Sequence, residues 1–385
     1  MRRVIWSCNR TGLPYTNVAV TVTSNQPPIQ TPNQTRTRAP VLLFPTHYLG
    51  NFVLGLPWVC EVLKQYPDAP VVLDSRFAPL AAMVLGEDVN LIYYPRDKIA
   101  KNQKFASRLR HYSGFLGALR RNRRDTLLDL EGERFTGVLS WLSGCKRRVG
   151  PTGKHAQRFY TDVRDLDYLR HRFNAFGEIV EGFTSGQAPV SVMNYRVSDE
   201  AQLAIQQRIG ATATLKPLVA IHPGASVDYK LWPRAYFVAL VGLLEASGYQ
   251  VVWVGAGSMD AKIIAEVQAL SPNSSTVDLC NALSFAELVT LYRCCRFFIG
   301  SDSGPMHLAA STGLPVFALF GPSKEAIWAP LGPGSHVLRG SKSCGESCDA
   351  QHCDFDYHCL TSLQPAQVMA AIERFGQQPA AKEKS

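Results

Sequence analysis

Residues 297–321 read FFIGSDSGPMHLAASTGLPVFALFG, and their pattern indicates the fold class most clearly. The stretch opens with an apolar run, residues 297–300, and closes with a second apolar run, residues 315–320. Between these runs lie a polar turn and a segment, residues 306–310, that suits a helix. Short apolar runs separated by a helical segment predict two buried, parallel strands joined by a crossover helix.

The same alternation of short apolar runs and helical segments fills the chain. One series lies before residue 185 and another after residue 216, with a polar, less periodic linker between them. Strands are expected at residues 41–44, 71–73, 91–94 and 126–130, and at residues 218–221, 250–254, 297–300 and 315–320. The predicted fold class is therefore α/β, with two Rossmann-like domains that each contain a parallel sheet.

Length and composition agree with two domains. The chain has 385 residues, more than one core usually serves, and 46% are apolar, which is enough for two cores. We expect a disordered tail at residues 1–38, an N-terminal domain at 39–190, and a C-terminal domain at 191–385 with a cysteine-rich segment and a terminal helix. No apolar run suits a membrane span or a signal peptide, so the expected location is the cytoplasm.

Much of the net charge of +9 is concentrated at residues 108–148. Such a surface suits an anionic partner, namely an acidic lipid, a phosphorylated glycan or a nucleic acid, and a solvated helix face is the alternative. The aromatic and basic repeat of nucleic-acid modules is missing, which argues against nucleic acid. The basic residues here are Arg108, Arg110, Arg120, Arg121, Arg123, Arg124, Lys146, Arg147 and Arg148.

The turn after residues 297–300 carries the most informative chemistry. Ser301 or Asp302 can cap the following helix, and Pro305 fits its first turn. The free N–H groups of that helix then point to the carboxyl end of a strand, where ligands bind in sheets of this kind. Such a helix start suits a diphosphate, whereas an ordinary capped turn with a merely packed His307 is the alternative.

Two further loops follow strands of the second series. HPGAS, residues 222–226, places a glycine at a strand end, and Lys230 follows as a point charge for a phosphate. GAGSMD, residues 255–260, ends in Asp260, whose carboxylate can bond ribose hydroxyls. A lone Gly-x-Gly is weak evidence, and an exposed loop lysine is the alternative for Lys230.

In combination, these segments resemble glycosyltransferase family 9, the ADP-heptose:lipopolysaccharide heptosyltransferases. The resemblance covers about residues 40–375 and is most specific in the C-terminal half. The matching stretches there are HPGAS (222–226) with KLWP (230–233), DSGPMHLAA (302–310) and LFGP (319–322). Looser matches in the N-terminal half are LGNFVLGLP (49–57), YPDA (66–69), and DLEG (129–132) with RRVG (147–150).

The resemblance implies a GT-B architecture, in which two Rossmann-like domains face an interdomain cleft. It implies an acceptor site in the first domain, a nucleotide-sugar site in the second, and inverting transfer of heptose from ADP-heptose to the inner core of lipopolysaccharide. It implies that no catalytic metal or other cofactor is required. Carried over by position, Lys230 and the residues Asp302, Ser303, Gly304, Pro305 and Met306 would hold the nucleotide diphosphate, with His307 beside them. Ser226 and Asp260 complete the candidate nucleotide-sugar site.

The acceptor implied by the resemblance, the lipopolysaccharide inner core, is anionic. The basic region of the first domain is therefore the expected acceptor surface, with Arg120, Arg121, Arg147 and Arg148 as its candidates. Peripheral contact with the cytoplasmic face of the inner membrane is a further expectation.

One position departs from the family pattern. The family usually places an aspartate, the presumed general base, after the glycine of the first strand-to-helix turn, and this chain has Asn51 after Gly50. An amide cannot take a proton at neutral pH, whereas inverting transfer requires an activated acceptor hydroxyl. His47 is the nearest candidate for another base. Two alternatives stay open, namely another nucleotide sugar or acceptor, and a protein that binds nucleotide sugar but transfers poorly.

Four of the ten cysteines cluster near the end of the chain, namely Cys344, Cys348, Cys353 and Cys359. Thiolates at this spacing can hold a structural zinc or iron ion, and a reduced surface loop is the alternative. The other cysteines are scattered, and without an export signal we do not expect a disulfide framework.

Overall fold

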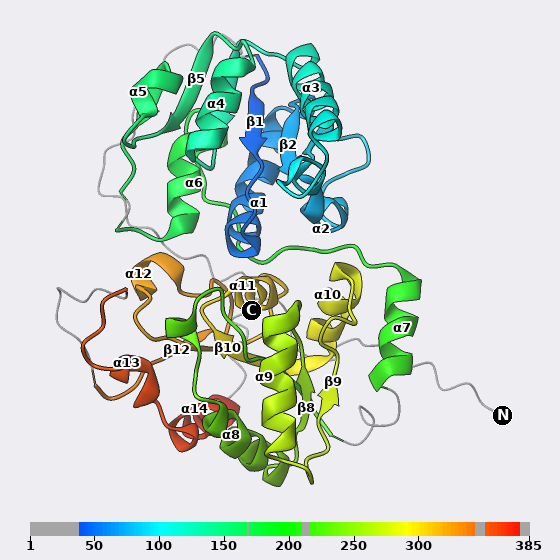
Figure 1. Ribbon diagram of the computed structural model, residues 1–385, viewed down its shortest axis with the longest axis vertical. Helices are drawn as coiled ribbons and strands as arrows, with labels where there is room; N and C mark the ends of the chain where they lie inside the picture. Colours follow the sequence, from blue (N-terminus) through cyan, green and yellow to red (C-terminus); the bar gives the residue numbers. More distant parts are fainter. Residues whose placement is uncertain (1–37, 168, 210–215, 343–350, 378–385) are drawn as a thin grey trace, which may run out of the picture. The chain divides into compact units, whose positions relative to one another are not determined.

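The computed structural model describes residues 38–167, 169–209, 216–342 and 351–377. These residues form two compact units, 38–191 and 192–377, and each unit contains its own six-stranded parallel sheet (Figure 1). The tail expected at residues 1–38 lies outside the described residues except for Arg38. Two parallel sheets with flanking helices confirm the α/β class.

The sheet of the first unit has the order β3-β2-β1-β4-β5-β6. Its central strand β1, Val41–Phe44, is wholly buried because all its side chains are apolar. β2 and β3 follow β1 on one side of it, and β4, β5 and β6 follow on its other side. The topological switch point, at which the strand order reverses, therefore lies between β1 and β4. The other strands are β2 (Val71–Asp74), β3 (Leu91–Tyr94), β4 (Thr126–Asp129), β5 (Arg147–Pro151) and β6 (Asp162–Arg164).

Helices connect the strands of the first unit and pack apolar side chains against the sheet. α1, Leu49–Gln65, begins directly after the turn that follows β1, and most of its side chains are buried. α3, Phe105–Arg121, buries two side chains, Phe115 and Leu119. The other helical segments are η1 (Ser75–Phe77), α2 (Ala78–Ala82), η2 (Arg96–Ile99), α4 (Arg134–Leu142), α5 (Ala156–Phe159) and α6 (Arg172–Val180).

The sheet of the second unit repeats this topology in the order β12-β11-β10-β7-β8-β9, with the switch point between β7 and β10. Its strands are β7 (Leu218–His222), β8 (Gln250–Trp253), β9 (Val277–Asp278), β10 (Cys295–Ser301), β11 (Val316–Leu319) and β12 (His336–Leu338). Its helical segments are α7 (Asp199–Ile209), η4 (Asp228–Lys230), α8 (Arg234–Ala246), α9 (Ser258–Ala269), α10 (Phe285–Cys294), α11 (Gly304–Ser311), α12 (Glu325–Trp328), α13 (His358–Thr361) and α14 (Pro365–Gln377).

The core of the second unit anchors the loop that carries Lys230. Trp232 follows two residues later, is 2% exposed, and packs edge-on against Phe237 of α8. Its indole Nε1 donates a hydrogen bond of 3.0 Å to the carbonyl oxygen of Leu363. A buried aromatic with its polar atom satisfied fixes the loop to the core at that point.

Among the described helices, none is long and apolar enough to cross a membrane.

Candidate functional site

The first candidate site lies at the switch point of the second sheet, where β7 and β10 run side by side. Gly300 of β10 pairs with His222, the last residue of β7. α11 begins shortly after β10, with Ser303 as its extended N-cap residue and Pro305 in its first turn. The unpaired N–H groups at the start of α11 therefore lie at the carboxyl edge of the sheet, where such groups commonly bind phosphate.

Lys230 and Asp302 meet at this helix start. The Lys230 ammonium donates a hydrogen bond of 2.7 Å to Oδ2 of Asp302. Asp302 is buried, and Nε2 of His307 lies 4.0 Å from its other carboxylate oxygen. The ammonium has three donors and uses one on Asp302, so it can also bind an anion held by α11. The structure thus brings together three residues that the sequence placed in one nucleotide site.

His222 connects the two loops on either side of the switch point. Its Nδ1 lies 3.3 Å from Oγ of Ser303, and its Nε2 lies 3.1 Å from Oδ2 of Asp260. Burial alone would raise the pKa of Asp260, but the hydrogen bond and charge of His222 and the bond from the Ala256 amide outweigh it, so this pKa lies below its usual value. Asp260 is therefore held as a carboxylate between the loops.

The position of Asp260 differs from the expectation that it bonds ribose. Oδ2 accepts hydrogen bonds from His222 and from the Ala256 amide. A Cβ atom on Gly224 would lie 1.7 Å from Oδ1 of Asp260, and one on Gly255 would lie 2.7 Å from its Cβ. The carboxylate is thus enclosed by its own loops, and these two glycines are required because Asp260 occupies the space of their side chains.

The other residues expected at this site differ in their exposure to solvent. Ser226 is exposed, and Ser303, Gly304 and Pro305 are half-buried. Met306 is 0% exposed and His307 is 3% exposed, so their side chains face the interior. Met306 can contribute to an anion site through its backbone N–H, whereas the His307 N–H already donates to the carbonyl oxygen of Ser303 at 3.4 Å.

The second candidate site lies at the switch point of the first sheet, in the turn between β1 and α1. Asn51 belongs to the first turn of α1, and His47 lies in the preceding turn, half-buried against the ring of Tyr48. Burial, followed by the nearby charges of Arg96 and Arg76, lowers the pKa of His47. The imidazole is therefore neutral at pH 7, which is the form that can accept a proton.

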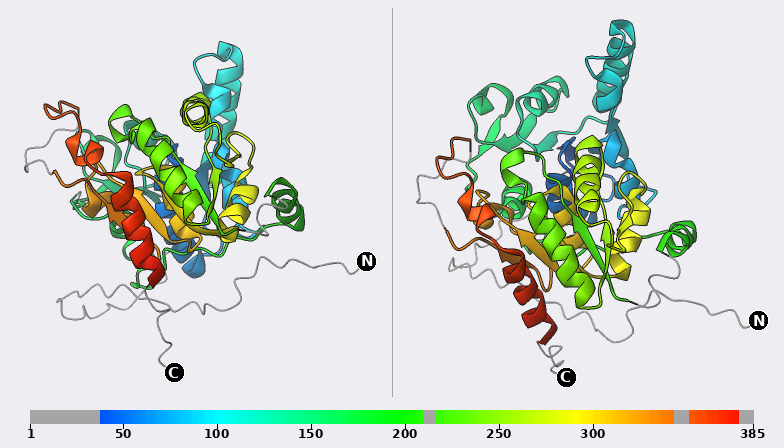
Figure 2. Two further views of the ribbon diagram at one scale, coloured as in Figure 1. Left: turned by 90° about the horizontal axis from the view of Figure 1, so that it is seen from below. Right: turned by 60° about the horizontal axis from the view of Figure 1, so that its bottom comes forward.

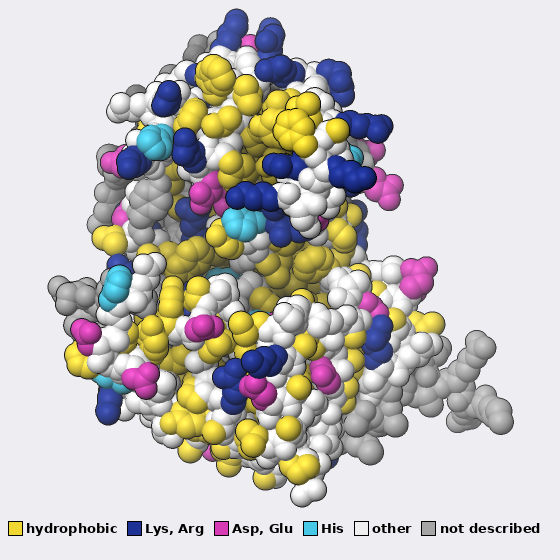
Figure 3. All heavy atoms as spheres, in the orientation of Figure 1, with side chains coloured by type: hydrophobic (Ala, Val, Ile, Leu, Met, Phe, Trp, Pro, Cys, Tyr) yellow, Lys and Arg dark blue, Asp and Glu magenta, His cyan; other side chains and the backbone are white. Residues whose placement is uncertain are grey.

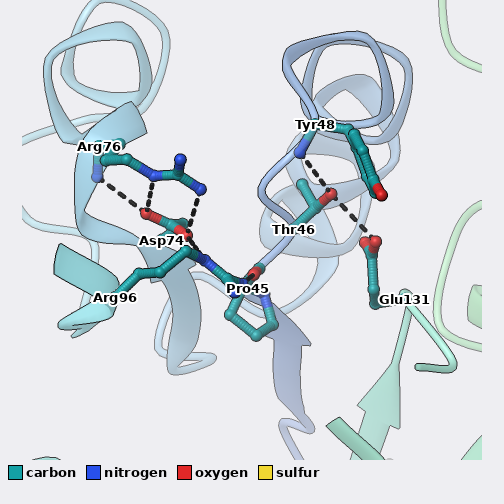
Figure 4. Close-up of polar contacts among 7 residues, drawn as sticks. All are labelled: Pro45, Thr46, Tyr48, Asp74, Arg76, Arg96 and Glu131. Atoms are coloured by element: carbon teal, nitrogen blue, oxygen red, sulfur yellow. Dashed lines mark hydrogen bonds and ion pairs between the residues drawn. The ribbon is translucent and has the colours of Figure 1, made fainter. Parts of the chain in front are cut away.

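A buried carboxyl group lies on the β4 side of the same switch point. Glu131 comes just after β4 and is 6% exposed. Its Oε1 accepts a hydrogen bond of 3.1 Å from the Thr46 hydroxyl, which itself accepts one from the Tyr48 amide (Figure 4). Oε2 has no hydrogen-bond partner within the part of the chain that the structure describes. Burial raises the pKa of Glu131 to about 7.

A cationic cluster follows the ends of β2 and β3 at this edge. Asp74, the last residue of β2, is wholly buried and is paired with both Arg76 and Arg96 (Figure 4). Arg96 also donates a hydrogen bond of 2.8 Å to the carbonyl oxygen of Pro45, in the turn that holds His47. The Asp97 carboxylate also acts on the Arg76 guanidinium, so the cluster, which we call cationic for its two guanidinium groups, contains acidic residues as well. Arg76 and Arg96 were not among the residues predicted from the sequence, and Glu131 stood only in the loosely matching stretch DLEG without a role, although each follows the end of a strand.

The arginines expected to bind the acceptor lie at the opposite edge of this sheet. Arg120 and Arg121 end α3, and Arg147 and Arg148 begin β5, so all four lie where the parallel strands start. Arg147 is paired with Asp162, and Arg148 donates to the carbonyl oxygens of Phe159 and Cys145. These four arginines therefore lie at the edge opposite the switch-point turn with His47 and Asn51, and their role in acceptor binding stays a prediction.

The late cysteines are only partly described. Cys344 and Cys348 lie outside the described residues, whereas Cys353 is half-buried and Cys359 is buried. The Tyr357 amide donates a hydrogen bond of 3.3 Å to Sγ of Cys353. Within the described ranges, no three histidine, cysteine or acidic residues are grouped as a metal site.

Comparison with known proteins assigns the family. The family model for glycosyltransferase family 9 (heptosyltransferase) matches residues 114–357. The chain belongs to this family. It is therefore an enzyme, a glycosyltransferase of the heptosyltransferase type, as the resemblance implied.

Curated relatives agree with this assignment. Lipopolysaccharide heptosyltransferase 3 of Escherichia coli is 24% identical over 339 residues, which cover 84% of this chain and 96% of the relative. Lipopolysaccharide heptosyltransferase 2 of Salmonella typhimurium is 33% identical over 235 residues, 58% of this chain and 67% of the relative.

Solved structures of family members share the fold. A family 9 glycosyltransferase from Veillonella parvula superposes with a TM-score of 0.75 at 22% identity, covering 90% of this chain and 99% of the other. E. coli ADP-heptose heptosyltransferase II superposes with a TM-score of 0.68 at 20% identity, covering 87% and 98%. The pair of Rossmann-like units is thus of the GT-B type.

Proposed function

We propose that this enzyme transfers heptose from ADP-heptose to the inner core of lipopolysaccharide, with inversion at the transferred carbon. The observation that carries the proposal is the start of α11 with Lys230 at the switch point of the second sheet. This arrangement suits the diphosphate of a sugar nucleotide. The names of the relatives support heptose as the sugar and lipopolysaccharide as the product, and a solved heptosyltransferase structure with a TM-score of 0.67 contains ADP.

On the donor side, the leaving group is ADP, whose negative charge grows as the bond to the sugar breaks. We assign stabilisation of this charge to the N–H groups at the start of α11 and to the Lys230 ammonium. Asp302 holds the ammonium in place, and Asp260 acts through His222 as a positioning residue for Ser303. In this proposal transfer proceeds without a catalytic metal.

On the acceptor side, the attacking hydroxyl must lose its proton, and Asn51 cannot take it. We assign the proton to His47, which is neutral, half-buried, and close to Asn51 along the chain. Glu131 is the second candidate because its pKa of about 7 is poised for proton transfer, although its carboxylate is covered by the Thr46 turn. A pH profile separates the two, since a His47 base would titrate below the ordinary histidine pKa.

In this proposal the acceptor binds to the cationic cluster, and not to the four arginines at the opposite edge of the sheet. Arg76 and Arg96 lie at the carboxyl edge, and their side chains are 37% and 25% exposed. Guanidinium groups bind carboxylates and phosphates through paired donors, so this cluster suits the anionic groups of an inner-core acceptor.

The test is direct. Purified protein incubated with ADP-heptose and core glycolipid from a strain lacking this protein should release ADP and increase the acceptor mass by one heptose. Release of ADP only from another sugar nucleotide would assign a different donor. Tight ADP-heptose binding without turnover would favour the alternative that Asn51 keeps open, a protein that binds nucleotide sugar but transfers poorly.

A structural metal at the four late cysteines is a separate proposal. It rests on their spacing and on the likeness, at 17% identity and a TM-score of 0.53, to the fold of the iron-containing heptosyltransferase TibC. Metal analysis of the purified protein should find close to one zinc or iron per chain. The proposal would be contradicted by purified protein that contains no metal, has all four thiols reduced, and shows the same melting temperature with and without added zinc or iron.

A further inference from the structure

The first half of α3 stands clear of the sheet that its second half covers. The buried side chains of this helix are Phe115 and Leu119, and residues 105–114 bury none. The ring of Phe115 packs edge-on against Tyr94, the last residue of β3. Tyr112 is partly buried against the core, so the turns of α3 that precede it are the ones that stand clear of the sheet, and Figure 2 shows this helix projecting from its unit.

The projecting half exposes two large apolar side chains. Phe105 is 76% exposed and Leu109 is 57% exposed. The spacing of four residues places them on one face of the helix. Among the described residues of their own unit, none covers this face enough to bury it. Neighbouring large apolar side chains that are exposed together commonly mark an interaction surface.

Positive charge surrounds this apolar face. Residues 98–112, which we call the cationic arm, contain five basic residues and no acidic residue. The Arg108 guanidinium donates a hydrogen bond of 3.1 Å to the carbonyl oxygen of Ile99, which ties η2 to α3. Lys and Arg side chains are also dense over the visible face of this unit and sparse over that of the other (Figure 3). The basic residues of the arm are Lys98, Lys101, Lys104, Arg108 and Arg110.

We propose that the cationic arm docks this enzyme on a membrane surface rich in acidic phospholipids, with Phe105 and Leu109 entering the headgroup region. A helix with exposed apolar side chains flanked by basic ones lies in such an interface, where lipid phosphates pair with the basic residues. A second copy of the chain fits this surface less well, because two arms of like charge repel each other.

The cationic arm begins beside the cationic cluster of Arg76 and Arg96. η2, which opens with Arg96, is packed against α3, and Arg96 is paired with buried Asp74 at the carboxyl edge of the first sheet. Docking through the arm would bring this edge near the lipid surface. The inference thus rests on the proposed function for its purpose, since an acceptor anchored in lipid would be presented at that surface, but vesicle binding itself needs no substrate.

The test is co-sedimentation of the full chain with vesicles of phosphatidylcholine alone and of phosphatidylcholine mixed with phosphatidylglycerol. The protein should bind the mixed vesicles, and added salt should release it because the attraction is screened. Each basic residue near an acidic surface contributes about fivefold to the binding constant, so Lys104→Glu should weaken binding at least about fivefold. Leu109→Ser alone should also weaken binding to the mixed vesicles, and the double variant Phe105→Ser/Leu109→Ser should weaken it more than either single substitution.

Matched controls lie in the second unit. Lys262→Glu reverses an exposed charge, and Leu270→Ser removes a side chain that is 62% exposed, so neither should alter vesicle binding. Equal losses in the controls, or no preference for the acidic vesicles, would overturn the proposal. Concentration-dependent self-association abolished by Phe105→Ser would assign the arm to a protein interface instead. Because no substrate is present, the outcome is independent of the transfer assay.

Discussion

In the second unit, the Lys230 ammonium lies 2.7 Å from Oδ2 of Asp302, with side chains that are 20% and 6% exposed. The pair sits at the start of α11, so the ammonium is fixed where a diphosphate would bind. A paired lysine in this position loses little freedom when a phosphate arrives, which favours binding.

Lys230→Ala should weaken ADP binding by about 1.5–3 kcal/mol, the usual range for a charged hydrogen bond. The loss includes repulsion of the ligand by the Asp302 carboxylate that the substitution leaves unpaired. Calorimetry with ADP measures it, and Lys262→Ala, which removes an exposed lysine from α9, is the control. Unchanged ADP affinity would remove Lys230 from the site.

Gly224→Ala should destabilise the protein by about 1–3 kcal/mol and weaken ADP binding, because the new Cβ would overlap the Asp260 carboxylate. Gly242→Ala is the matched control, since a Cβ at that position in α8 meets no atom within 4 Å. The control should stabilise the protein slightly, because alanine favours a helix interior over glycine. Thermal melts of the two variants give the comparison, and equal melting temperatures would contradict the packing argument.

Asn51→Asp should raise kcat and leave substrate KM values nearly unchanged if the site lacks only a base, because proton removal matters in the transition state. If His47 already serves, the same change should do little, and His47→Ala should lower kcat instead. Steady-state kinetics of the two variants decide between these outcomes. Should neither variant alter turnover, Glu131→Gln is the next to measure.

Glu131 should make the folded state less stable as pH rises from about 4.5 to about 7, because burial raises its pKa across that range. Over this window the folded state binds more protons than the unfolded state, so the free energy of unfolding falls with pH and then levels off. Glu131→Gln should reduce that fall, by at most about 3 kcal/mol. Denaturant unfolding at several pH values measures it, with the exposed Glu133→Gln as the control. Parallel curves for Glu131→Gln and the unaltered protein would show that Glu131 does not titrate in this way.

Arg96→Ala should raise the acceptor KM and leave ADP affinity unchanged, since the cationic cluster lies in the first unit. Arg120→Ala should change neither quantity, because that side chain is at the opposite edge of the sheet and bonds the carbonyl oxygen of Leu142. The reverse pattern would restore the original assignment of the acceptor surface. A fold check by circular dichroism is needed for Arg96→Ala, because Asp74 is buried and would keep only Arg76.

Features of this protein that depend on neighbours along the chain could be predicted from local patterns of residues. Runs such as VLLF at residues 41–44 predict buried strands because each side chain must leave water, and the structure confirms this strand. The start of α11 was likewise predictable, since a polar turn before Gly304 and Pro305 is a local signal for a helix start, but its N-cap residue is Ser303 without a side-chain cap bond, and not Ser301 or Asp302 as expected. Short edge strands such as β6 and β12 were missed because their charged or mixed residues carry no strong apolar pattern.

Tertiary structure decided which of the charged residues share a site. Arg120 and Arg148 looked like acceptor ligands because they are basic, but parallel strands have a direction, and both lie where strands begin. Asp260 looked free to bind ribose, yet it is enclosed by Gly224 and bonded to His222 across the sheet. The pKa of Glu131, raised to about 7, depends on burial by distant segments. Direction, enclosure and burial arise from contacts between residues far apart in the chain, which local patterns do not record.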